Sequence, residues 1–237
     1  MVKRNIVSYI MAAIWGVLIG ETSYNIVLNN LINYYDNDKS KFDNNDILNL
    51  LFINTDYKAI EYMDEQNIMM LMIPITFLFI GLLLSCEFLA KPKKYYSMIA
   101  GRTSSYKEMC RIIYGKPFFK IILYAVSYAS IIMMHCNQEN NYIDIILMTI
   151  VYILFIILLS RIAFFICKVS NSGFAIVISL IILMFVYLFD MYIPCFSIVL
   201  YNTYNHSIID VFTLIIFIIV INIIDICISK ERGLYVY

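Results

Sequence analysis

Positive charge gathers in one stretch of this chain, AKPKKYYSMIAGRTSSYKEMCRIIYGKPF, which covers residues 90–118. The stretch has a single acid, Glu108, and long apolar runs flank it on both sides. Its seven basic residues are Lys91, Lys93, Lys94, Arg102, Lys107, Arg111 and Lys116. The chemistry open to such a stretch is attraction to an anionic surface, which is either lipid headgroups or an acidic face of a protein partner. Charge alone does not decide between these two.

A helix is expected to begin near Ser105, inside this basic stretch. Ser105 and Glu108 have the spacing of a capping box, in which each side chain bonds the other residue's backbone N–H. The apolar residues that follow are spaced as one helical stripe, at Tyr106, Met109, Cys110 and Ile113. Before them, residues 93–100 form a second short helix in this interpretation, closed by Gly101. The stretch therefore predicts one or two short helices at a membrane surface.

Polar side chains inside apolar runs are functional candidates, because lipid makes them costly. Glu21 interrupts the first apolar run, where it either anchors the end of a helix or faces a translocation path. Asn222 and Asp225 are three residues apart in the last run and share a helical face. We expect them to bond a neighbouring helix rather than to bind an ion. Asp144 and Asp190 fall near the ends of their runs and are predicted to be boundary residues.

Catalytic and metal-binding patterns are sparse. The chain has two histidines, His135 and His206, and six scattered cysteines without a C-x-x-C pair. No H-E-x-x-H motif is present, so no catalytic residue and no metal ligand is assigned. Cys136 and Cys195 are both predicted on the outer side, where a disulfide between them is one open interpretation. A metal site that combines them with the two histidines is a minor alternative.

The elements that must position these residues are membrane helices. The chain is 62% hydrophobic and 14% charged, whereas a soluble domain is about half apolar and a quarter charged. Lipid offers the backbone no hydrogen-bond partners, so each span of about 20 residues must be helical. The fold class is thus an all-α polytopic membrane protein with one transmembrane domain, residues 1–237. Its six predicted spans are residues 5–28, 67–89, 117–136, 143–167, 172–193 and 209–229.

Lysine and arginine alternate between connections, which sets the predicted orientation. Both termini and the segment 90–116 are basic, whereas the loop 29–66 is rich in Asp and Asn. The positive-inside rule then makes the termini and segment 90–116 cytoplasmic. Loop 29–66 is either a small outer cap or a solvated connector, with Asp46 as the predicted N-cap of a short helix. The apolar connection before the sixth span is long enough to turn back into the membrane.

This plan resembles the small six-helix permease subunits of bacterial ABC exporters, the class that shares its fold with the G-type half-transporters. The resemblance rests on SCEF at 85–88, KKYYSMIAGRTSS at 93–105 and YGK at 114–116. These strings are similar to that family's acid at the end of the second span, its coupling helix with an Arg–Ser cluster, and the basic start of its third span. Pro92 and the two lysines after it depart from the Gly-Thr-like turn of relatives, which leaves the start of the coupling helix undefined.

The resemblance implies that a separate ABC ATP-binding subunit docks on the cytoplasmic segment. The implied docking residues are Glu87, Lys93, Lys94, Tyr95, Tyr96, Met98, Ile99, Arg102 and Ser105. ATP and Mg²⁺ would belong to that partner, since the chain has no G-x-x-x-x-G-K-[ST] motif, and no cofactor is expected here. A second permease subunit, identical or different, would complete the pathway within the lipid bilayer.

The resemblance and the composition also imply a cellular location and a class of transported molecule. The chain is rich in Asn, Ile, Lys and Tyr, which indicates a low-GC bacterium and hence its plasma membrane. By analogy the exported cargo is a peptide or another amphipathic molecule, in toxin export or immunity. The chain is not expected to be an enzyme or to bind nucleic acid. The alternatives are a stand-alone membrane accessory or immunity protein and, behind it, an intramembrane enzyme.

Overall fold

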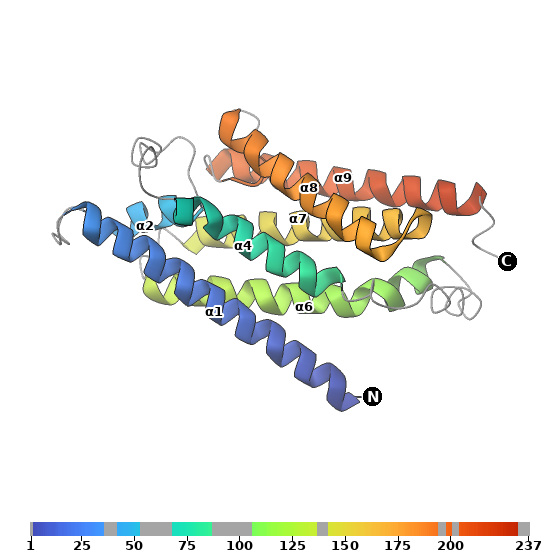
Figure 1. The fold of residues 1–237 in the computed structure, drawn as a ribbon, viewed down its shortest axis with the longest axis horizontal. Helices are drawn as coiled ribbons and strands as arrows, with labels where there is room; N and C mark the ends of the chain where they lie inside the picture. The colour runs from blue at the N-terminus through green and yellow to red at the C-terminus, as the bar shows by residue number, and fades with distance from the viewer. Residues whose placement is uncertain are drawn as a thin grey trace.

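The computed structural model describes residues 2–35, 42–52, 68–86, 106–136, 142–193, 198–200 and 204–231. All regular secondary structure within these ranges is helical (Figure 1). The helices are α1 (Val2–Tyr34), α2 (Asn44–Leu51), α4 (Ile68–Ser85), α6 (Tyr106–His135), α7 (Tyr142–Val169), α8 (Ser172–Tyr192) and α9 (Tyr204–Glu231). The predicted all-helical fold class is confirmed in these ranges.

Five of the helices are long and apolar enough to cross a membrane. Their apolar spans are Ile6–Tyr34, Gly115–His135, Tyr142–Cys167, Ser172–Asp190 and Ile208–Cys227. Within the predicted span 67–89, the described residues form α4, which has 18 residues and contains Pro74. The chain is therefore built as a polytopic membrane protein. The predicted loop at 29–66 begins later than expected, because α1 continues to Tyr34.

Helix α6 joins two elements that the sequence analysis separates. The predicted amphipathic helix after Ser105 and the predicted span from Pro117 form one continuous helix of 30 residues. Proline lacks the N–H that would bond the carbonyl of residue 113, so it often ends or bends a helix. Inside a membrane bundle the helix can continue through a proline, because neighbouring helices hold the two halves in line. Ser105 lies outside the described residues, so its capping role stays a prediction.

An aromatic cluster from three helices forms the centre of the bundle. The Phe77 ring of α4 lies 4.7 Å from Tyr124 and 4.5 Å from Tyr128 of α6, and 5.3 Å from Tyr152 of α7, measured between ring centroids. The Tyr124 hydroxyl donates a hydrogen bond to the backbone carbonyl of Phe77 at 3.1 Å. The side chains of all four aromatic residues are buried. The cluster connects α4, α6 and α7 in the interior of the bundle.

Large apolar side chains cover the outside of α8 and α9. Phe185 of α8 is 69% exposed and Phe212 of α9 is 63% exposed, and Ile181 of α8 and many isoleucines of α9 are exposed as well. A soluble monomer rarely shows such continuous apolar surface. These faces are suited to lipid or to another membrane helix.

The long helices alternate in direction along the bundle (Figure 1). One end, here called the α2 end, carries α2, the C-terminal ends of α1, α6 and α8, and the N-terminal ends of α4, α7 and α9. The start of α1 and the end of α9 lie at the opposite end, together with the end of α4 and the start of α6. The connection between α4 and α6, which contains the first part of the basic stretch, therefore begins and ends at this opposite end.

Candidate functional site

The predicted docking residues lie outside the described part of the chain. This applies to Glu87, Lys93, Lys94, Tyr95, Tyr96, Met98, Ile99, Arg102 and Ser105. Their docking role stays a prediction. The described residues on either side, Ser85 at the end of α4 and Tyr106 at the start of α6, fix where this connection attaches to the bundle.

The seam between α1 and α6 depends on two glycines. A Cβ atom added to Gly16 would overlap the backbone carbonyl oxygen of Tyr124 and lie 2.8 Å from the Ser127 Cβ. A Cβ atom added to Gly20 would lie 3.0 Å from the Ile131 Cβ. Glycines four residues apart let two membrane helices approach closely. The G-x-x-x-G spacing in WGVLIG is a readable signal for this seam that hydropathy alone does not reveal.

Glu21 pairs with a histidine where the seam reaches the α2 end. The His135 Nε2 lies 3.2 Å from each carboxylate oxygen of Glu21, and the Tyr24 ring stacks on the His135 ring with centroids 4.2 Å apart. Ser23, two residues further along α1, is buried. Glu21 thus bonds a side chain of a neighbouring helix. The sequence reveals Glu21 as a polar residue in an apolar run, but its partner is 114 positions away and carries no local signal.

The pairing of Glu21 with His135 is expected to contribute little to stability. Their side chains are 42% and 35% exposed, and pairs of this kind are worth at most about 1 kcal/mol. In a double-mutant cycle with Glu21→Gln and His135→Gln, unfolding in detergent should give a coupling energy below about 1 kcal/mol. A coupling above about 2 kcal/mol would show that the pair is a structural lock instead.

Cys136 is a free and fully buried thiol beside this pair. Cys195 lies outside the described residues, so the disulfide between Cys136 and Cys195 stays a prediction. The Cys136 side chain belongs to the hydrophobic core. Within the described ranges, no three His, Cys, Asp or Glu side chains gather as a metal site.

Asp190 lies at the end of the apolar span Ser172–Asp190, as predicted, and its carboxylate accepts hydrogen bonds there. Its side chain is completely buried at the end of α8. One carboxylate oxygen, Oδ2, accepts hydrogen bonds from the backbone N–H groups of Ile198, Val199 and Leu200 at 3.0, 2.6 and 3.2 Å. Val199 and Leu200 are each 1% exposed. The connection between α8 and α9 thus turns back against the bundle at these three residues, held by a single carboxylate.

Two acids of α9, in addition to Asp190 of α8, face the interior of the bundle. Asp210 is 6% exposed and lies close enough to Asp190 for the two carboxyl groups to interact electrostatically. Asp225 is 5% exposed, whereas Ile223 and Ile224 beside it are exposed. Helix α9 packs against α7, so Asp225 lies on the bundle side of α9 and not on its lipid side. Asn222 is half-buried one turn earlier.

Helix α2 starts earlier than the sequence analysis places it. The N-cap is Asp43, not Asp46: the Asp43 side chain accepts a hydrogen bond from the Asp46 backbone N–H at 3.0 Å. The Asp46 carboxylate accepts one in return from the Asp43 backbone N–H at 2.9 Å. This reciprocal capping box satisfies two N–H groups, which a cap at Asp46 would not do. Burial raises the pKa of Asp46, and the neighbouring Asp43 carboxylate raises it further.

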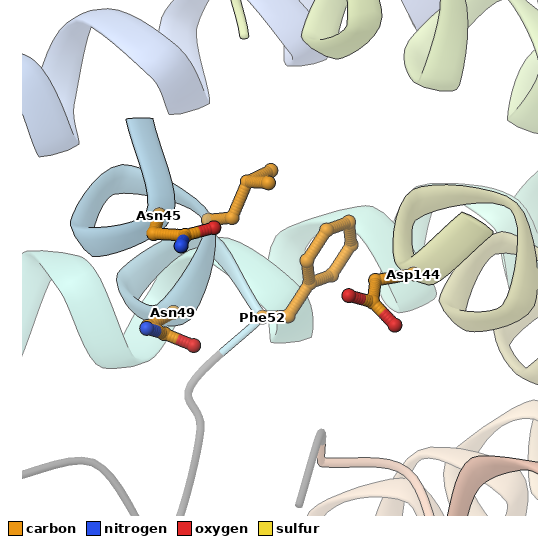
Figure 2. A pocket seen from close by; sticks show the side chains of 5 residues that line it. Asn45, Asn49, Phe52 and Asp144 are labelled. Carbon is orange, nitrogen blue, oxygen red and sulfur yellow. The ribbon is translucent and has the colours of Figure 1, made fainter. Parts of the chain in front are cut away.

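A small pocket lies between α2 and the start of α7 (Figure 2). Its volume is about 30 Å³, and it is lined by Asn45, Leu48, Asn49, Phe52 and Asp144. Figure 2 shows the two amides on α2, the Asp144 carboxylate on the start of α7, and the Phe52 ring between them. Asp144 is predicted to lie at a span boundary, and only the fold brings it to α2.

No protein-family model, curated protein or solved structure matches this chain.

Proposed function

We propose that this chain is the membrane-spanning permease subunit of an ABC transporter that exports a peptide or another amphipathic molecule. A separate ATP-binding subunit, with its ATP and Mg²⁺, docks on residues 87–105 and drives the cycle. In this proposal six helices span the membrane, with α4 and the apolar residues after it as the second span. The basic segment faces the cytoplasm of a bacterium and the α2 end faces outward.

The continuity of α6 is the observation that carries this proposal. The helix begins at Tyr106, inside the basic segment 90–116, and continues without a break to His135. At about 1.5 Å per residue, its 30 residues cover about 45 Å. Tyr124 and Tyr128 of the same helix pack on Phe77 of α4, and Tyr124 meets α1 at Gly16. A displacement of the start of α6 would therefore be transmitted to the centre of the bundle and to the contact between α6 and α1.

The exposed apolar faces of α8 and α9 support a larger assembly. A single set of short spans makes a narrow pathway, so a second permease subunit, identical or different, is proposed to complete it. The cargo class comes from analogy with the resembling family, in which export and immunity are both found. Toxin export and toxin immunity are the two settings proposed.

Co-purification tests this proposal. The chain is extracted from its native membrane in mild detergent, and the proteins that accompany it are identified. The same is done with residues 93–99 replaced by a Gly/Ser linker and, as a matched control, with residues 36–41 replaced likewise. The expected result is a stoichiometric ATP-binding subunit with the wild type and the control, lost with the first variant. A chain that purifies alone in all three cases would favour a stand-alone accessory or immunity protein.

A further inference from the structure

We draw no further inference here: the strongest candidate, the pair of buried carboxyl groups formed by Asp190 at the end of α8 and Asp210 in α9, adjoins residues outside the described part of the chain, and no described contact shows what the two acids would bind.

Discussion

Replacing Gly16 with leucine is expected to lower the free energy of unfolding by about 3 kcal/mol or more. Overpacking a filled interior costs about 1–3 kcal/mol and sometimes more. The cost at Gly16 is expected at or above the upper limit of this range, because a Cβ there would overlap the backbone carbonyl oxygen of Tyr124. A backbone atom cannot move aside as the end of a flexible side chain can. The only relief is for α1 to move away from α6, which would also separate Glu21 from His135 at the end of the seam.

The matched control for this change is Gly115→Ala, also in a long helix. A Cβ added at Gly115 meets nothing within 4 Å, and alanine favours a helix by up to about 1 kcal/mol over glycine. Unfolding in detergent should therefore show Gly115→Ala equal to or slightly more stable than wild type and Gly16→Leu strongly destabilised. A Gly16→Leu variant as stable as wild type would mean that the α1–α6 seam is not closely packed.

Replacing Asp190 with alanine is expected to release the segment 198–200 from the bundle. The change leaves three backbone N–H groups without their acceptor, and two of these residues, Val199 and Leu200, are almost fully buried. An unsatisfied buried donor costs about 1–3 kcal/mol. The segment can recover part of this by moving into water, so we expect a total loss on the order of 3 kcal/mol.

Hydrogen exchange at the three amides measures this release directly. In Asp190→Ala, the amide hydrogens of Ile198, Val199 and Leu200 should exchange about 100-fold faster than in wild type. Asp190→Asn keeps one carbonyl oxygen as an acceptor and should give an intermediate rate. Unchanged exchange at these amides in Asp190→Ala would show that the segment is held by apolar packing and not by the carboxylate.

The helices of this protein could be predicted from the sequence because the bilayer leaves few choices. Runs of about 20 apolar residues must be helical in lipid. Five of the predicted runs correspond to helices long enough to span a membrane, and α4 covers residues 68–85 of the run predicted at 67–89. Helix ends were harder to predict. Hydropathy marks where the apolar residues stop and not where the hydrogen bonds stop. For that reason α1 continues to Tyr34, past the predicted end of its span at residue 28, whereas the start of α6 at Tyr106 agrees with the helix predicted from the capping pattern at Ser105.

The contacts between helices could be predicted only where a local pattern exists. Gly16 and Gly20 have such a pattern in their spacing, and the capping box of α2 has one in Asp43 and Asp46. The pairing of Glu21 with His135 and the bonds of Asp190 with residues 198–200 have none. Each depends on contacts between residues that are far apart in the sequence or in separate elements. No local sequence pattern marks such contacts.

The proposed docking of an ATP-binding subunit on the connection between α4 and α6 can be tested by photo-crosslinking from that connection in native membranes. A photo-reactive phenylalanine analogue replaces Met98, and a second chain carries it in place of Lys39 in the connection at the α2 end. The account predicts a crosslink from position 98 to an ATP-binding protein, with a yield that changes when ATP and vanadate are added, and none from position 39. A position-98 variant that is crosslinked only to lipid would contradict the account.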